Sequence, residues 1–332
     1  MSGISRRGVL AGTVAVTAVT AAPAAFAGQA GELSLKGKSI LITGTSSGFG
    51  NLGAMHYARL GARVFATMRN VPRPEADALR KLARDENLDL HVIEIDVLSD
   101  ELVASGVAEA ERINGGPLDV LVNNAGIVIS GPIEVQGMDA TRLAFETNVI
   151  GYQRLIRAVL PGMRARKSGL IVNISSQQGR VMMPHFGLYS ATKFAVESMS
   201  EQLAYELVPY GIDVLIIEPG GYPTDVGQNR AKYTQALATT VEEKHASGYP
   251  DQIERMKTPA RTGTWPGAPD PMDIPRTIAE VAAMPAGRRP LRLAVHPDNK
   301  PQLEINRVSQ ETQLSWLGQM PGAGDMVKAV YD

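Results

Sequence analysis

The chain has 332 residues, of which 44% are hydrophobic and 20% are charged, so it can bury a sizeable core and does not have the composition of a disordered protein. Its 33 basic and 34 acidic side chains leave a formal charge of −1, which gives no reason to expect a nucleic-acid partner. The absence of cysteine excludes disulfides, cysteine-based zinc or iron–sulfur sites and a thiol nucleophile.

The first 27 residues have the order of an export signal. A pair of arginines, Arg6 and Arg7, precedes an apolar run over residues 9–22, and the segment ends in Ala-Phe-Ala at 25–27. This order is typical of a signal peptide, and the arginine pair gives it the twin-arginine form. The run is shorter than the ~20 apolar residues of a membrane span. We therefore expect a twin-arginine signal peptide over 1–27, no stable membrane span and a periplasmic or other extracytoplasmic location; the alternative is a cytoplasmic protein whose signal is not used.

Beyond this segment, short apolar runs with strand character alternate with stretches long enough for helices. The runs are almost continuously apolar, which is typical of strands covered on both faces, and strands joined by helical crossovers lie parallel. We therefore expect one α/β domain over residues 35–295, of the Rossmann-type doubly wound class, with a seven-stranded parallel sheet flanked by helices. The seven expected strands are residues 38–43, 63–68, 90–95, 118–122, 170–174, 213–217 and 291–295.

Two segments do not follow this alternation. Residues 220–273 are rich in Gly, Pro and Thr, have no strand signal and are long for a loop in a compact domain, so we expect them to form a mobile substrate lid. Residues 296–332 form a polar C-terminal tail that carries Trp316, and no pattern assigns this tail to an element.

A glycine-rich turn follows the first expected strand and opens a helical stretch. Residues 43–50 read Thr-Gly-Thr-Ser-Ser-Gly-Phe-Gly. In this context the backbone N–H groups of such a turn can approach a pyrophosphate, and a side chain at Gly44 or Gly48 would obstruct the approach. The spacing differs from the plain dinucleotide fingerprint, and a tight turn of small residues is the alternative. We expect a dinucleotide to contact Gly44, Ser46, Ser47, Gly48, Phe49 and Gly50.

The end of the second expected strand indicates which dinucleotide is bound. An acid there would accept hydrogen bonds from the ribose 2′-OH, whereas an arginine would pair with a 2′-phosphate. This chain has Arg69 and no acid at that point. NADP(H) is therefore favoured and NAD(H) remains possible; the alternative is that Arg69 is only a solvated surface charge.

Tyr189 and Lys193 lie four residues apart at the start of an expected helix, so both point the same way. A neighbouring cation favours phenolate, and we expect Lys193 to lower the pKa of Tyr189 from about 10 toward neutrality, which would make it a usable general acid or base. This pair alone is common by chance and usually means an exposed helix face.

Other motifs accompany the pair at expected strand ends. Asn-Asn-Ala-Gly at 123–126 follows the fourth strand, Asn-Ile-Ser-Ser at 173–176 ends the fifth, and Asn148 lies after a helical stretch. At this point the chain resembles the short-chain dehydrogenase/reductase family, over roughly residues 35–295. Asp96-Val97 and Pro219-Gly220 with Thr224 complete the resemblance.

The resemblance implies a role for each matching position. Ser176, thirteen residues before Tyr189, would hold the substrate oxygen in preference to Ser175, and Tyr189 would pass a proton to or from that oxygen. Lys193 would act on Tyr189 and hold the nicotinamide ribose, while Asn148 would orient a water linking Lys193 to solvent. Asp96 would contact adenine, Asn124 the adenine ribose and the central strands, and Pro219, Gly220 and Thr224 would border the nicotinamide. The remaining implied cofactor contacts are Val97, Ala125 and Gly126.

The expected reaction is hydride transfer between NADP(H) and an alcohol or carbonyl, with no metal required. Met182, Met183, Phe186 and Tyr222 should flank the substrate, and they favour an apolar steroid-, retinoid- or lipid-like compound. Phe49 resembles the turn of steroid and retinol dehydrogenases in the family. The alternative function is a protein that senses or holds the cofactor without turnover.

The resemblance also implies a homodimer or homotetramer. Its usual contacts would be the helices expected over residues 151–166 and 191–207, whose apolar positions permit a second packed face. The alternative is that both helices pack only on their own sheet.

Overall fold

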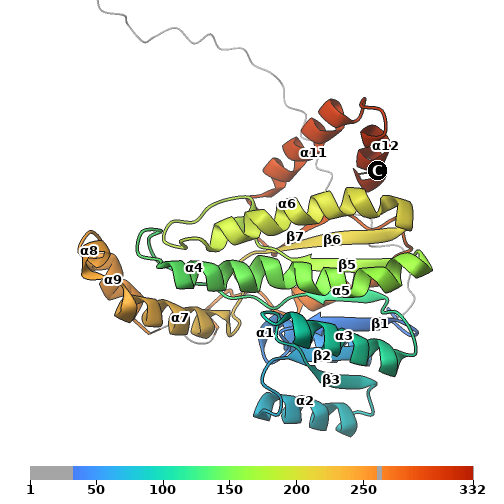
Figure 1. Cartoon of the computed structure of the whole chain (residues 1–332), viewed down its shortest axis with the longest axis horizontal. Coiled ribbons are helices and arrows are strands. Elements are labelled where there is room, and N and C mark those ends of the chain that lie inside the picture. The colour runs from blue at the N-terminus through green and yellow to red at the C-terminus, as the bar shows by residue number, and fades with distance from the viewer. Residues whose placement is uncertain (1–32, 260–263, 332) are drawn as a thin grey trace, which may run out of the picture. The chain divides into compact units, whose positions relative to one another are not determined.

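The computed structural model describes residues 33–259 and 264–331, so the expected signal peptide lies outside the described residues. It confirms a seven-stranded, all-parallel sheet in the order β3-β2-β1-β4-β5-β6-β7 (Figure 1). The observed strands differ from the expected ones by at most two residues at either end. They are β1 Ser39–Thr43, β2 Arg63–Met68, β3 Leu90–Glu94, β4 Val120–Asn123, β5 Gly169–Ile174, β6 Ile212–Pro219 and β7 Arg292–Val295.

Helices cover both faces of this sheet because successive strand residues point to opposite sides and both sides are apolar. Ile40 and Ile42 of β1 belong to one core cluster, and Leu41 between them belongs to the other. The first cluster includes buried residues of α1 (Gly48–Arg59), α2 (Pro74–Asp85) and α10 (Asp273–Ala283). The second includes those of α3 (Asp100–Asn114), α5 (Gly151–Arg166) and α6 (Tyr189–Leu207).

The strand order reverses direction between β1 and β4, and ligands of open parallel sheets bind beyond the strand ends at such a point. The glycine-rich turn follows β1 there, and the Asn-Asn-Ala-Gly motif begins at the last residue of β4. After β4 the chain forms α4 (Met138–Phe145), which continues through a π-helical turn at Glu146–Ile150 into α5. A π-helical turn is often found at functional sites, and this one contains Asn148.

The described part of 220–273 contains three helices rather than an irregular loop throughout. They are α7 (Val226–Thr240), α8 (Glu243–Ala246) and α9 (Pro250–Lys257). Leu237 of α7 and Met256 of α9 pack with Val135 in a third, smaller core cluster. Helices α8 and α9 are short and the apolar periodicity of α7 is weak, so the sequence pattern did not predict these helices. The role of the segment as a lid stays a prediction.

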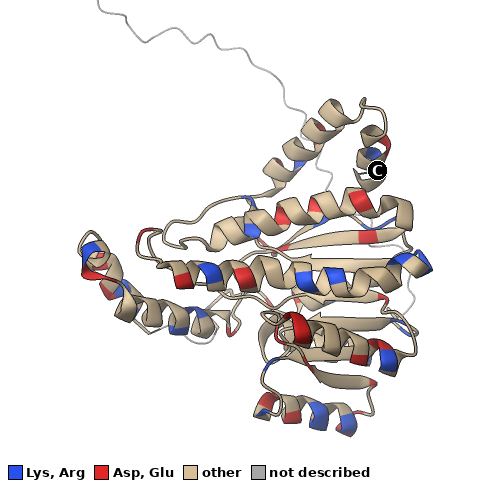
Figure 2. Ribbon diagram, in the orientation of Figure 1, with Lys and Arg blue, Asp and Glu red and all other residues tan. Residues whose placement is uncertain are grey.

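The polar tail also forms helices, α11 (Leu303–Leu317) and α12 (Ala323–Tyr331). α11 has no buried residue, whereas α12 packs against α6 and buries Val327. Short 3-10 helices occupy Gln177–Gly179 and Val208–Tyr210. Acidic and basic residues lie close together on the outer helices α2 and α3, as the balanced composition leads one to expect (Figure 2). Among the described residues, no helix is long and apolar enough to cross a membrane.

Candidate active site

Two glycines of the turn after β1 are required by close packing. Gly44 has a φ of 72°, and a Cβ there would lie 2.9 Å from the Cα of Ala125. A Cβ on Gly50 would lie 2.2 Å from the carbonyl oxygen of Gly44. Because both contacts are with backbone atoms, a side chain at Gly44 would force the turn away from the segment that follows β4, and a side chain at Gly50 would disrupt the turn itself.

The helix start behind this turn suits an anion. Ser47, at the N-cap of α1, makes no side-chain capping bond, and the first turn of α1 has no acidic residue. The first N–H groups of a helix lack partners within the helix, and with the helix dipole they attract phosphate groups. Thr224 lies on the other side of the turn, 3.6 Å from a Cβ placed on Gly48. The residues therefore fit a dinucleotide pyrophosphate, whose cradle would be Ser46, Ser47, Gly48, Phe49 and Gly50.

The Asn-Asn-Ala-Gly motif joins β4 to the same turn. The Asn124 side chain donates to the carbonyl of Thr43 at 2.8 Å, and the Thr43 hydroxyl accepts from the backbone N–H groups of Asn124 and Ala125 at 3.0 Å each. These bonds give Asn124 the expected place between central strands. Asp96 lies just beyond β3 and accepts from the N–H of Leu98 at 3.0 Å, so its carboxylate shapes the loop that carries buried Val97.

Arg69 lies exposed one residue beyond β2. Its guanidinium donates to the hydroxyl of Tyr233 on α7 at 3.2 Å. Arg69, the residue expected to bind a 2′-phosphate, thus contacts Tyr233 in the segment that we expect to form the lid.

The structure places Ser176, Tyr189 and Lys193 together. Tyr189 is the first residue of α6, and Lys193 lies one turn later with its ammonium 5.8 Å from the centre of the Tyr189 ring. The ammonium donates to the carbonyl of Ile174 at 2.8 Å. The Ser176 hydroxyl accepts from the N–H of Gln178 at 3.1 Å and lies near enough to Tyr189 to lower its pKa. All three side chains therefore lie at the carboxyl end of β5.

The neighbouring serine points elsewhere. The Ser175 hydroxyl lies 2.6 Å from a Cβ placed on Gly179 and has no partner among the described residues. The geometry therefore supports the choice of Ser176 over Ser175.

The pKa values differ from those expected. Burial raises the pKa of Tyr189 to about 12, although its hydrogen bond to Ser176 lowers it. Burial also lowers the pKa of Lys193 to about 8. The expectation that Lys193 brings the Tyr189 pKa toward neutrality is wrong for this structure, because desolvation outweighs the other effects. At neutral pH Tyr189 is therefore a protonated phenol, the form that donates a proton.

Asn148 is fully engaged within the protein. Its side-chain oxygen accepts from the N–H of Ile127 at 2.8 Å, and its amide nitrogen donates to the Ile127 carbonyl at 2.9 Å and to the Thr192 hydroxyl at 3.0 Å. A Cβ on Gly126 would lie 3.3 Å from the Asn148 oxygen and 3.9 Å from the Lys193 nitrogen. Asn148 thus holds the segment at Gly126 and Ile127 in place beside Lys193.

The side expected to border the nicotinamide includes a residue that the sequence did not reveal. A Cβ on Gly220, which follows Pro219 at the end of β6, would lie 2.5 Å from the Cδ2 atom of His296. The ring of Tyr222 lies 5.6 Å from that of His296 and 5.5 Å from that of Phe49. His296 directly follows β7, so the rule that ligands bind beyond strand ends could have found it.

The expected substrate side is apolar but contains one unexpected cation. Met182 and Met183 are 75% and 44% exposed, and the ring of Phe186 lies 6.4 Å from that of Tyr189. The Arg230 guanidinium of α7 lies over the Phe186 ring, 5.3 Å from its centre. Arg230 and Phe186 are distant in the sequence, so this contact could not be predicted from the sequence.

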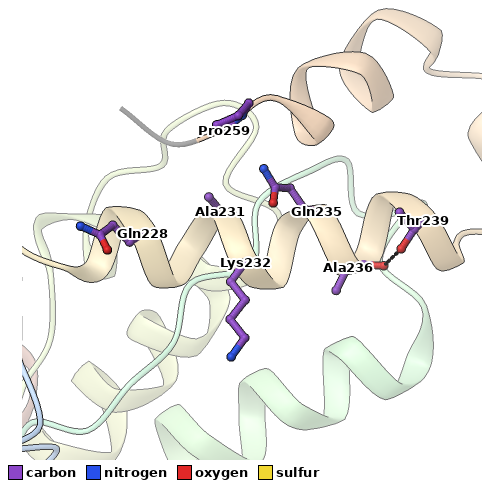
Figure 3. A pocket seen from close by; sticks show the side chains of 7 residues that line it. All are labelled: Gln228, Ala231, Lys232, Gln235, Ala236, Thr239 and Pro259. Atoms are coloured by element: carbon purple, nitrogen blue, oxygen red, sulfur yellow. Dashed lines mark hydrogen bonds between the residues drawn. The ribbon is translucent and has the colours of Figure 1, made fainter. Parts of the chain in front are cut away.

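A surface pocket elsewhere on α7 is separate from these residues. Figure 3 shows it along one side of the helix, with Gln228, Lys232 and Thr239 on α7 and Pro259 beyond α9. None of Ser176, Tyr189, Lys193 or the glycines of the turn lines it. We therefore do not assign this pocket to the reaction.

Comparison with known proteins gives relatives over most of the domain. The family model described as short chain dehydrogenase matches residues 38–235. The chain is 40% identical to the uncharacterized oxidoreductase YusZ of Bacillus subtilis, over 57% of this chain and 66% of YusZ. It is 39% identical to retinol dehydrogenase 8 of Bos taurus, over 57% of this chain and 60% of that protein. The match thus spans less than two thirds of the length of these two relatives.

A solved structure extends the similarity to nearly the whole described chain. A short-chain dehydrogenase from Streptomyces avermitilis is 32% identical and superposes with a TM-score of 0.63, over 84% of this chain and 95% of its own. The family match, the strand order and the grouping of Ser176, Tyr189 and Lys193 agree. The chain belongs to the short-chain dehydrogenase/reductase family of NAD(P)-dependent oxidoreductases.

Proposed function

We propose that the protein transfers a hydride between NADP(H) and an apolar alcohol or carbonyl compound. The observation that carries this proposal is the grouping of Ser176, Tyr189 and Lys193 at the carboxyl end of β5. A cofactor bound at the glycine-rich turn would supply the hydride. The chain itself supplies the proton and the groups that stabilise charge on the substrate oxygen.

In the reducing direction, negative charge develops on the carbonyl oxygen as its carbon gains hydride. Ser176 would donate a hydrogen bond to that oxygen, and the protonated Tyr189 would transfer its proton to it. The buried Lys193 ammonium stabilises the phenolate that remains, and it exerts its field in a medium that screens charge weakly. Oxidation of an alcohol would reverse these steps.

Two features support NADP(H) over NAD(H). Arg69 follows β2 at the position where an acid would bind an unmodified ribose, and its exposed guanidinium is held by a neutral hydroxyl rather than by a carboxylate. A guanidinium can therefore pair with a 2′-phosphate at little cost.

An apolar substrate is supported by the exposed methionines and the ring of Phe186 beside Tyr189. Phe49 and Tyr222 are in edge-to-face contact, but Tyr222 is buried in the core cluster shared with α1 and α10, so it does not add to this surface as expected. The similarity to a protein named as a retinol dehydrogenase agrees with a lipid-like alcohol.

The test is a panel of steroid, retinoid and long-chain carbonyls and alcohols, each supplied with NADP(H) and NAD(H), with turnover read from the nicotinamide absorbance. We expect turnover of apolar carbonyls with NADPH and little with sugar acids. If no compound turns over with either cofactor while the folded protein binds NADPH, the enzymatic proposal is contradicted in favour of a cofactor sensor.

A further inference from the structure

A line of buried ionisable side chains runs along one face of α6. Lys193, Glu197 and Glu201 are spaced four residues apart, so they lie one above another, and their exposures are only 4%, 2% and 8%. Charged side chains are rarely buried unless they are paired. The first is the lysine of the active site, and the reaction described above gives no role to the other two.

Arg292 of β7 pairs with both glutamates. Its guanidinium donates to one carboxylate oxygen of Glu197 at 2.9 Å and also to Glu201. Glu201 in addition accepts from the hydroxyl of Tyr331, in the C-terminal helix α12, at 2.6 Å. The two carboxylates therefore hold the Arg292 guanidinium in place, and the guanidinium orients the carboxylate of Glu197.

The second carboxylate oxygen of Glu197 points toward the active-site turn. This oxygen lies 3.2 Å from a Cβ placed on Gly179, the position that also meets the Ser175 hydroxyl, and it has no partner among the described residues. Gly179 ends the short helix that starts directly after Ser176. The carboxylate thus lies behind the turn that carries Ser176, one helical turn from Lys193.

We propose that Glu197 is a positioning residue for Lys193: its carboxylate, held by Arg292 and buried one helical turn away on the same face of α6, keeps the buried ammonium charged. Among the described residues, the direct contacts of the ammonium are neutral groups, and Glu197 acts on it from a greater distance. The ammonium donates to the Ile174 carbonyl and lies 5.5 Å and 5.8 Å from the ring centres of Tyr152 and Tyr189. Glu197 is the carboxylate whose charge acts on this ammonium.

The direction of the electrostatic effect supports this role. Burial alone would lower the pKa of Lys193 further than about 8, and the charge of Glu197 raises it. Loss of that charge would leave much of the lysine neutral at physiological pH. A neutral amine stabilises the Tyr189 phenolate far less than an ammonium does.

The other charged groups of this region lie on neighbouring elements. Glu218 of β6 has a pKa raised to about 8 by burial and by the charge of Glu197, so it is largely protonated at neutral pH. Arg180, beyond the 3-10 helix, and Arg292 act on Glu218 in the opposite sense. Glu201 is paired with Arg292, two helical turns from Lys193.

The inference rests on the proposed function only for its catalytic consequence, because the charge of Lys193 can be measured without substrate. The experiment follows the side-chain carbon resonances of 13C-labelled lysine across a pH titration of the full chain, with Lys193 assigned by its loss in Lys193→Arg. Glu197→Gln should lower the Lys193 pKa by about one unit. Glu201→Gln removes a carboxylate two helical turns from Lys193 and keeps the Glu197–Arg292 pair, so it should shift the Lys193 pKa much less than Glu197→Gln does.

Two further variants keep the test decisive. Glu197→Asp retains the charge and should restore titration near the wild-type value, and Glu197→Met provides a second neutral side chain if the glutamine variant does not fold. An unchanged Lys193 pKa in the neutral Glu197 variants, or an equal shift in Glu201→Gln, would overturn the proposal. Because these readouts need no turnover, they remain valid even if the substrate panel fails.

Discussion

Lys193 and Tyr189 titrate in an order that limits catalysis at high pH. Lys193 has a pKa of about 8, whereas the pKa of Tyr189 is about 12. Raising the pH therefore removes the ammonium long before the phenol ionises. The lysine, not the tyrosine, should set the upper pH limit for carbonyl reduction.

We therefore predict that kcat for carbonyl reduction falls as the pH rises through about 8. Lys193→Arg should move this fall beyond pH 10, because a guanidinium stays protonated there, although the absolute rate will be lower. Measuring kcat at saturating cofactor from pH 6 to 10 checks this. Glu218→Gln is the matched control, since Glu218 also titrates near 8. If the fall in kcat near pH 8 disappears in Glu218→Gln and persists in Lys193→Arg, the assignment of this fall to Lys193 is contradicted.

Arg69 allows a second prediction at the scale of one residue. Replacing it with glutamine removes the partner of a 2′-phosphate and should weaken NADPH binding by about tenfold or more, with little effect on NADH. Arg73→Gln is the control, because Arg73 is already paired with Glu75. Fluorescence titration with both cofactors measures the two dissociation constants. Equal losses for NADPH and NADH would show that Arg69 does not read the phosphate.

At the scale of elements, the strands were predictable and several helices were not. Continuous apolar runs located all seven strands, and polar motifs at their ends located Asn124 and Ser176. The three helices within 226–257 and the two within 303–331 are short or weakly periodic. Their contacts with distant parts of the chain, such as Val135 for α7 and α9 and helix α6 for α12, leave no local pattern.

Local sequence reasoning also missed contacts between distant residues. Glu197 and Arg292 are separated by 95 positions, yet they form one buried ion pair. The raised pKa of Tyr189 has the same origin, because burial depends on the folded environment and not on the neighbouring lysine alone.

The surface of α6 supports a prediction about assembly. We propose that α5 and α6 form an interface between copies of the chain, and Phe194 on α6 is 40% exposed. Phe194→Glu should convert a dimer or tetramer to monomers, because a charge would be buried in the contact. Met320→Glu, at a comparably exposed apolar position beyond α11, should not. Sedimentation velocity distinguishes these outcomes. A monomeric wild-type protein, or no difference between the two variants, would refute the interface.

For the whole molecule, the export proposed from the sequence would determine where the reaction takes place. We propose twin-arginine export with cleavage after Ala27, and because that route carries folded proteins, the cofactor would be acquired before export. Changing Arg6 and Arg7 to lysine should hold the full-length chain in the cytoplasm. Cell fractionation and the N-terminal sequence of the exported protein test this. If the wild-type chain also stays uncleaved in the cytoplasm, the signal is not used.

The central claim is that Tyr189 delivers the proton in a hydride transfer carried out at this site. The most direct measurement follows deuterium from NADPH that is deuterated at both C4 positions into the alcohol product by mass spectrometry, for the wild type and Tyr189→Phe. The account predicts one deuterium per wild-type product and a rate about 10² to 10⁴ times lower in the variant, with NADPH affinity retained. A variant that turns over at the wild-type rate, or a product without the label, would contradict it.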